Sequence, residues 1–172
     1  MVDVKGFNTS WITTILGAPM RFDLSARSSG RLTSDRYADV TNFITQMTHR
    51  RGGVWDDTER LDWRNISDVE SMQITVQASE EDTQVRILAD YAAMTFFAFF
   101  AILFSGMFIA AAIGGFVFQP STLSGMAVIA VVGAIGSYAA ARAAWKGFAQ
   151  KRHRDLQRLL EALVAFVDKT SV

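Results

Sequence analysis

Few residues of this chain are of the types that carry out catalysis or bind metal ions. It has no cysteine and two histidines, His49 and His153, and the second lies within a run of basic residues. Without Cys or paired His residues, the sequence offers neither a zinc site of the usual spacing nor a histidine-activated nucleophile. We therefore interpret His153 as a solvated member of the basic run.

Two polar segments resemble ligand sites in composition only. The segment 54–65 could attract a divalent cation, but it lacks the spacing, the glycine and the terminal glutamate of a calcium loop; its acidic residues are Asp56, Asp57, Glu59 and Asp62. The segment 50–53 reads Arg-Arg-Gly-Gly, which is too short for a phosphate-binding loop and fits the end of a helix. We predict a solvated acidic loop, no catalytic residue, no metal site and no cofactor.

The strongest pattern is a run from Tyr91 to Ala141 without a charged side chain, divided by the turn signal Gln119-Pro120-Ser121-Thr122. Roughly 20 apolar residues cross a hydrocarbon core. A charge at its centre costs about 2.5 to 3.5 kcal/mol on insertion scales. We predict two transmembrane helices, at about 91–118 and 124–145, joined by an extracytoplasmic turn at 119–123.

Basic residues after this run set the expected orientation. The chain is neutral overall, with 17 basic and 17 acidic residues, but acids dominate before residue 90 and bases after residue 142. The positive-inside bias predicts that both termini are cytoplasmic, most simply in a bacterial inner membrane. The same residues attract anionic lipid: Arg142, Lys146, Lys151, Arg152, Arg154 and Arg158. The acidic neighbour argues against a nucleic-acid partner.

Small residues recur every four positions on both apolar helices. Because close packing drives helix association in lipid, we expect these residues to mark helix contacts. The first helix has one such stripe (Gly106, Ala110, Gly114) and the second has two (Gly133, Ser137, Ala141, and Gly136, Ala140, Ala144). One stripe on each helix suffices to pair them, so the other predicts a contact with another subunit or a second copy. The bulky stripe Phe97, Phe100, Phe104 and Phe108 fits lipid contact or a slot for a partner.

The rest of the chain is expected to be helical. Segment 25–30 is interpreted as a linker, and a cap at Thr33 or Ser34 predicts a helix that carries Tyr37, Val40, Phe43, Ile44 and Met47 and ends before Gly52. From Glu80 nothing breaks a helix before Gly114, so one helix is expected over 79–118. The second apolar helix should continue through 146–172. The predicted fold is an all-α membrane protein: a two-pass helical hairpin with cytoplasmic helical extensions and a small N-terminal cytoplasmic region, 1–78, of short amphipathic helices.

Two segments allow alternative interpretations. Trp11 to Leu16 fits a short interfacial helix or a helix packed on the cytoplasmic part. Met72 to Ala78 alternates with period two and favours a short strand, although Ser67 and Glu70 also fit a helical capping box. No pairing partner for that strand is evident in the sequence.

The two cytoplasmic extensions are expected to form a helical stalk. Folding the hairpin would set Glu80, Glu81, Asp82 and Asp90 beside the basic cluster, and exposed pairs of this kind contribute about 0 to 1 kcal/mol each. The C-terminal segment also carries an apolar seam with helical spacing, which predicts either packing on this chain's own N-terminal helix or a partner interface: Leu156, Leu159, Leu160, Leu163, Phe166 and Val167.

A surplus of helix-packing surface without a reactive site favours a non-enzymatic role. We expect a structural or assembly subunit of a multiprotein bacterial inner-membrane complex, of the secretion or conjugation type, whose partners are the lipid bilayer and other subunits or further copies of itself. The alternative is a self-associating pore former of the holin or effector type, which the same hairpin would suit. The lack of ionisable residues between 91 and 141 argues against a transporter or a proton-driven motor.

Overall fold

The computed structural model describes residues 11–68, 70–80, 82–118 and 123–170. For residues 11, 12, 117, 118 and 123 it describes the backbone only. The predicted turn at 119–123 lies almost wholly outside this described part. The chain forms two compact units. The first, here called the sheet unit, comprises residues 1–8, 19–92 and 150–172, and the second, the hairpin unit, comprises residues 9–18 and 93–149.

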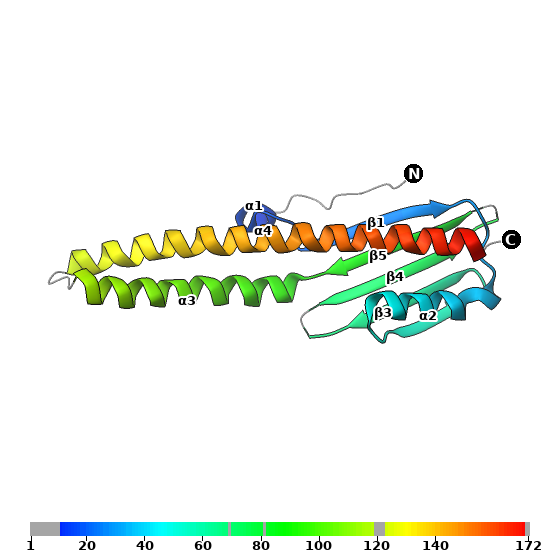
Figure 1. Cartoon of the computed structure of the whole chain (residues 1–172), viewed down its shortest axis with the longest axis horizontal. Coiled ribbons are helices and arrows are strands. Elements are labelled where there is room, and N and C mark those ends of the chain that lie inside the picture. The colour runs from blue at the N-terminus through cyan, green and yellow to red at the C-terminus, as the bar shows by residue number, and fades with distance from the viewer. Residues whose placement is uncertain (1–10, 69, 81, 119–122, 171–172) are drawn as a thin grey trace. The chain divides into compact units, whose positions relative to one another are not determined.

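The prediction of an all-α fold is wrong, because the sheet unit is built on a five-stranded antiparallel sheet (Figure 1). Its strand order is β1-β5-β4-β3-β2, so the first strand lies beside the last. The strands are β1 (Arg21–Ser28), β2 (Gly53–Asp57), β3 (Arg60–Ile66), β4 (Ser71–Ala78) and β5 (Thr83–Asp90). The region 1–78 is therefore not a set of short helices.

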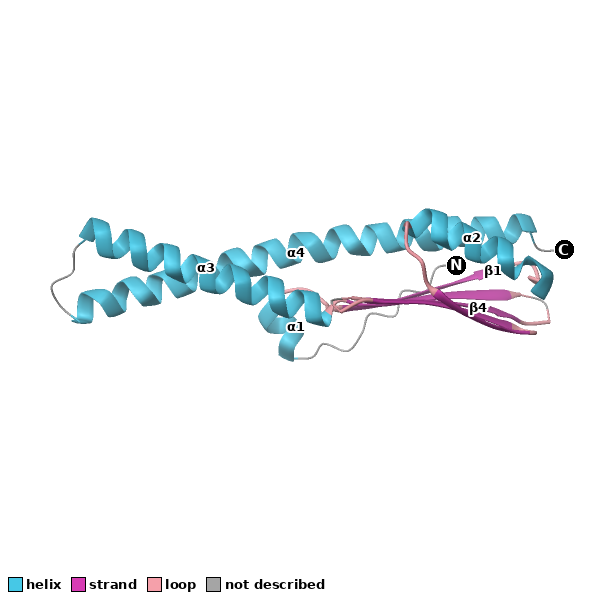
Figure 2. Cartoon of the chain, turned by 90° about the horizontal axis from the view of Figure 1, so that it is seen from below, coloured by secondary structure: helices cyan, strands magenta, loops and turns pink. Residues whose placement is uncertain are grey.

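One face of the sheet carries the core. Alternate side chains along β1, β3, β4 and β5 are buried, among them the fully buried Trp63, Ile74 and Ile87. Helix α2 (Tyr37–Thr48) and the part of α4 after residue 150 cover this face, and no described element of the unit covers the opposite face, here called the open face (Figure 2). The ring of Phe43 on α2 stacks on Phe166 of α4, with 4.5 Å between the ring centres. The apolar seam of α4 is thus part of the core of its own chain.

Strand β5 occupies a segment that was expected to begin a long helix. Its buried residues, Thr83, Val85, Ile87 and Ala89, recur with period two. On a helix those four positions would point in different directions, whereas a strand places all four on one face. Acidic residues at 80–82, which favour a helix start, instead precede a strand. The helix that follows, α3, runs from Ala92 to Phe118.

The other strands also differ from the expected linker and loop. Segment 25–30 was interpreted as a linker, but β1 pairs with β5 along its whole length, from Arg21 opposite Asp90 to Ser28 opposite Thr83. The acidic segment 54–65 forms most of the β2–β3 pair. The preference for a strand at 72–78 is confirmed, with β3 and β4 adjacent and β5 on the other side of β4. Ser67 and Glu70 bond to each other in the turn before β4 rather than capping a helix.

The helix predicted after Ser34 is present. A 3-10 turn, η1 (Ser34–Arg36), leads into α2, whose buried residues are Tyr37, Val40 and Ile44. His49 ends it in the left-handed conformation, with a φ of 54°, three residues before the first of the two glycines.

The hairpin unit contains α1 (Trp11–Leu16), α3 and residues 123–149 of α4 (Leu123–Thr170). The helix α4 continues without a break beyond the apolar run, as its lack of stop signals indicated, and contributes to both units. Helix α1 therefore belongs with the apolar helices and not with the sheet unit. Gly17 follows it with a φ of +79°, a conformation that glycine adopts without strain.

Candidate functional site

The surfaces that could carry function are the apolar helices and the open face of the sheet. Within the hairpin unit, the small residues of α3 face one of the two small stripes of α4. A side chain added at Gly106 would collide with Ser137, and the Cβ of an added side chain at Gly133 would lie 2.5 Å from Cβ of Ala110. Gly133, Ser137 and Ala141, here called the inner stripe, are all buried. Gly114 lies against Ile129.

The second stripe of α4 faces away from α3. No atom would lie within 4 Å of a Cβ added at Gly136, and Ala140 and Ala144 are exposed. We call Gly136, Ala140 and Ala144 the outer stripe. The sequence identified both stripes but could not tell which one meets α3, because each has the same four-residue spacing.

The outer surface of the hairpin unit is apolar and uncovered. Phe97, Phe104 and Phe108 are exposed, and Phe100 lies between Phe96 and Phe104 in a chain of ring contacts. Helices α3 and α4 are long and apolar enough to cross a membrane, by length and composition. In the most apolar stretch of 18 residues, 6% of α3 is buried, and in the corresponding stretch of α4 the buried share is 11%. The core helix of a water-soluble protein would instead be mostly covered.

Two hydroxyl side chains of these helices are buried, whereas Ser105 of α3 is exposed. Thr95 of α3 and Ser137 of α4 are both buried, and the Ser137 hydroxyl donates a 2.7 Å hydrogen bond to the carbonyl of Gly133. A hydroxyl that bonds to its own helix needs no water, which suits a medium that supplies none.

The seam of α4 is not available as a partner interface. Leu156, Leu159, Leu160, Leu163 and Val167 are buried within the sheet unit, and Phe166 packs on Phe43. Of the two interpretations of this seam, packing within the chain is the one the structure contains. The sequence did not predict the sheet on which this part of α4 lies.

The predicted stalk of paired acidic and basic helices is also wrong. Asp90 pairs with Arg21 at 2.7 Å and Asp82 with Arg27 at 3.6 Å, so both acids bond across the β1–β5 pair. The carboxylate of Asp90 also accepts a 2.8 Å hydrogen bond from the amide of Ala92 at the start of α3. Glu81 lies outside the described residues.

The six basic residues after the apolar run have different surroundings. In the sheet unit, Arg152 lies over the ring of Tyr91, with 5.7 Å from its guanidinium carbon to the ring centre. Arg152 and Arg158 line a hollow of about 300 Å³ together with Arg50. Lys151 and Arg154 are exposed. In the hairpin unit, Arg142 and Lys146 are exposed, and the Arg142 side chain passes close to Gly17.

His153 is not a free member of the basic run. Its ring is half-buried and stacks on Phe22 of β1, with 5.8 Å between the ring centres. The apolar face of the imidazole therefore packs at the edge of the sheet core, which its basic neighbours in the sequence did not indicate.

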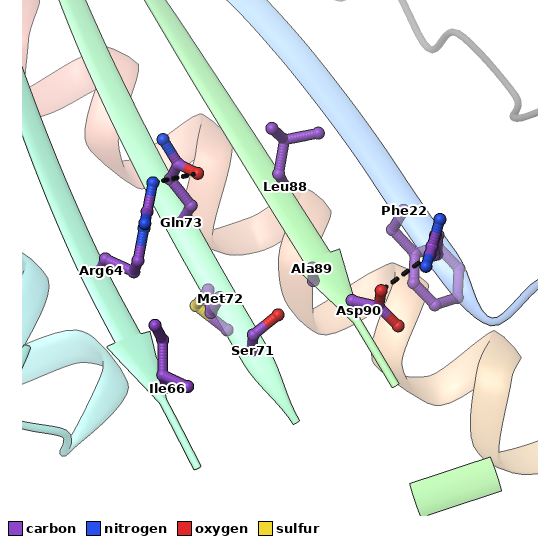
Figure 3. A pocket seen from close by; sticks show the side chains of 10 residues that line it. Phe22, Arg64, Ile66, Ser71, Met72, Gln73, Leu88, Ala89 and Asp90 are labelled. Carbon is purple, nitrogen blue, oxygen red and sulfur yellow. Dashed lines mark hydrogen bonds and ion pairs between the residues drawn. The ribbon is translucent and has the colours of Figure 1, made fainter. Parts of the chain in front are cut away.

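The open face of the sheet carries a hollow of about 400 Å³ over the ends of β3, β4 and β5 (Figure 3). Arg64 and Gln73 lie along one side of it, joined by a 3.2 Å hydrogen bond, and Leu88 lies on the neighbouring strand. The exposed Ile66 and the pair Arg21 and Asp90 complete its rim. Sequence reasoning missed this surface because β1, β3 and β5 were not assigned as strands.

Charged groups on this face are paired with neighbours on the same strand or on adjacent strands. Arg86 binds Asp23 through two hydrogen bonds of 2.8 and 2.6 Å, and Arg64 lies over the ring of the exposed Trp55. The hydrogen bond and charge of Asp23 raise the pKa of Arg86. Asp62 accepts a 2.6 Å bond from the Thr75 hydroxyl and pairs with Arg60 at 2.8 Å. Partial burial raises the pKa of Asp62, but these bonds outweigh it, so that the pKa lies below its ordinary value.

The acidic segment does not gather its side chains around one point. Asp57 accepts bonds from the amide and hydroxyl of Thr58 in the β2–β3 turn, whereas Asp62 bonds to Thr75 on β4. Among the described residues, no group of three or more His, Asp or Glu side chains could hold a metal ion.

Comparison of the chain with models of protein families, with curated proteins and with solved structures finds no match.

Proposed function

We propose that this protein is a non-enzymatic, membrane-anchored assembly subunit of a multiprotein complex in a bacterial inner membrane. The proposal rests on the different surfaces of its two units. The hairpin unit has a largely uncovered apolar surface, and no described element covers one face of the sheet unit.

The composition of the sheet unit supports a two-pass topology. This unit combines residues 19–92, which precede α3, with residues 150–172, which end α4. Segments that share one hydrophobic core must lie on the same side of a membrane. The apolar helices between them therefore cross it an even number of times, and the two helices α3 and α4 satisfy this condition. The basic residues that follow the apolar run favour the cytoplasm as that side.

Two uncovered surfaces support a role in assembly. The outer stripe offers a close approach for another helix in lipid, since its residues are small and face open space. The open face of the sheet combines apolar side chains, Leu88 and Ile66, with paired charges around a hollow. The charges described on this face pair with one another, and the pKa shifts of Arg86 and Asp62 come with these pairs, as in structural ion pairs.

The alternative of a self-associating pore draws less support. A pore that conducts ions needs polar groups along its lumen. Thr95 and Ser137 are buried within a single hairpin, which leaves few hydroxyls, such as the exposed Ser105, to line a channel formed by several copies.

Copurification tests the proposal most directly. The full chain, carrying a C-terminal tag, would be extracted in mild detergent and separated on a native gel, with subunits identified from the gel band. We expect comigration with distinct membrane proteins in fixed proportion. Migration as a pure homo-oligomer, together with release of dye from liposomes that contain the purified protein alone, would instead favour the pore.

A further inference from the structure

We propose that α1 is a membrane-interface helix, which lies among lipid headgroups against residues 138–145 of α4. The inference rests on the proposed function, since it requires that the hairpin unit crosses a bilayer. The sequence left two positions open for this segment, and the structure places α1 in the hairpin unit.

The first argument concerns stability. Helix α1 has six residues, and helices of this length do not persist in water without tertiary contacts. Leu16 and Ala18 are buried, and the side chain of Arg142 on α4 passes beside Gly17. The position of α1 is therefore set by the apolar part of α4.

The second argument concerns the carbonyl groups at the end of α1. The last carbonyls of a helix have no partner within it, and in a medium without water each needs another donor. The Tyr138 hydroxyl donates a 2.7 Å hydrogen bond to the carbonyl of Ile15, and the Trp145 indole donates one of 3.3 Å to the carbonyl of Ala18. The amide of Gly17 donates to the carbonyl of Thr13 at 2.8 Å. These bonds suit a helix end that water reaches poorly.

The third argument concerns depth. Tyr and Trp concentrate where a bilayer meets water, and Tyr138 and Trp145 are separated by seven residues, roughly 10 Å along a helix axis. The polar layer on each side of a hydrocarbon core is of the same order, about 5 to 8 Å. Ile15 is 43% exposed and Thr14 is exposed, so α1 presents a mixed surface to its surroundings. Such a surface matches the headgroup layer better than either water or hydrocarbon.

Spin labels can measure this depth, because the chain has no cysteine that would compete for the label. The full chain would carry a nitroxide at Ile15→Cys, in liposomes of phosphatidylcholine and phosphatidylglycerol. Collisions of the label with oxygen, which concentrates in lipid, and with a water-soluble nickel chelate would be compared. Two matched labels set the scale: Val131→Cys, exposed on the apolar part of α4, and Thr33→Cys, exposed in the sheet unit.

We expect the Ile15 label to fall between the two references, with oxygen access several-fold above that of the Thr33 label. A label at Ile15 that matches the Thr33 label, while the Val131 label reports lipid, would overturn the inference and leave the membrane anchor intact. A Val131 label with the accessibility of the Thr33 label would refute the anchor itself.

A second variant tests the assigned contact. Tyr138→Phe removes only the hydroxyl that bonds to α1. In this background we expect the Ile15 label to gain access to the nickel chelate while the Val131 label is unchanged. No change at Ile15 would overturn the assignment of Tyr138 as the residue that holds α1 at the interface.

Discussion

The methyl group of Ala110 on α3 occupies the space that a side chain at position 133 of α4 would need, with 2.5 Å between Cβ of Ala110 and a Cβ added at Gly133. Because this contact joins the two apolar helices, Gly133→Leu should separate them. We expect overpacking to cost about 1 to 3 kcal/mol. The midpoint of unfolding in sodium dodecyl sulfate, followed by circular dichroism in mixed micelles, measures the loss.

A matched substitution lies three residues further along the same helix. Gly136→Leu adds the same side chain where no atom lies within 4 Å, so the hairpin itself should unfold at an unchanged concentration of dodecyl sulfate. If the outer stripe is the contact with another subunit, this variant should insert normally but lose its partners on a native gel. Equal loss of hairpin stability in the two variants would contradict the assignment of inner and outer stripes.

The seam of α4 makes a separate prediction for the sheet unit. Leu160 is fully buried, and Leu160→Ala should destabilise this unit by about 2 to 5 kcal/mol, the usual range for such a truncation in a core. Hydrogen exchange of β4 peptides, measured by mass spectrometry on the full chain in mild detergent, reports the change. Its exposed neighbour supplies the control, since Glu161→Ala should leave β4 protection unaltered. Normal protection in Leu160→Ala would mean that the seam does not belong to the core.

Asp62 should make the stability of the sheet unit depend on acid. Its bonds to Thr75 and Arg60 lower its pKa in the folded state below the ordinary value of 3.8, despite the opposing effect of burial. The stabilisation is therefore complete above pH 3.8 and is lost as the pH falls through the lowered pKa. Asp62→Asn should reduce the unfolding temperature at pH 7, and the difference from the parent should narrow in strong acid. A difference that is the same at pH 7 and pH 2 would contradict this linkage.

Gly52 lies against the indole of Trp63, with 2.5 Å between a Cβ added at position 52 and Nε1 of the ring. The ring is fully buried and cannot move aside without disturbing its neighbours. Gly52→Ala should therefore destabilise the sheet unit by about 1 to 3 kcal/mol. Gly147→Ala meets open space on a helix and should be neutral or stabilising by up to about 1 kcal/mol. The unfolding temperatures of the two variants distinguish them. An unchanged unfolding temperature for Gly52→Ala would show that the indole of Trp63 can move aside.

The helices were predictable because their signals are local. The spacing of Tyr37, Val40 and Ile44 and the glycines after His49 define α2 within one segment. The charge-free run likewise marks the apolar helices. Small residues at fixed spacing predicted that Gly106 and Gly133 lie at helix contacts, but the choice between the two stripes of α4 depends on the rotation of one helix against the other.

The sheet was not predictable to the same degree, because its evidence is distributed along the chain. Arg21 pairs with Asp90, and residues so far apart leave no local trace of their contact. Apolar and polar residues alternate along β5, yet the acidic residues before it also fit the start of a helix. A strand with no evident pairing partner is a weak prediction. β1 and β3 are the partners of β5 and β4, and all four strands contribute to the open face.

The bond between Ser28 and Asp168, with 2.5 Å between their oxygens, joins the first strand to the last turn of the chain's final helix. The sheet can therefore acquire its cover from α4 only after the chain has been synthesised as far as Asp168. Until then, of the two helices that cover the buried face of the sheet, α2 alone can be in place. On the proposed two-pass topology, a molecule whose α4 failed to return to the side of the sheet would leave core residues such as Ile74 exposed, and we expect proteases to remove it.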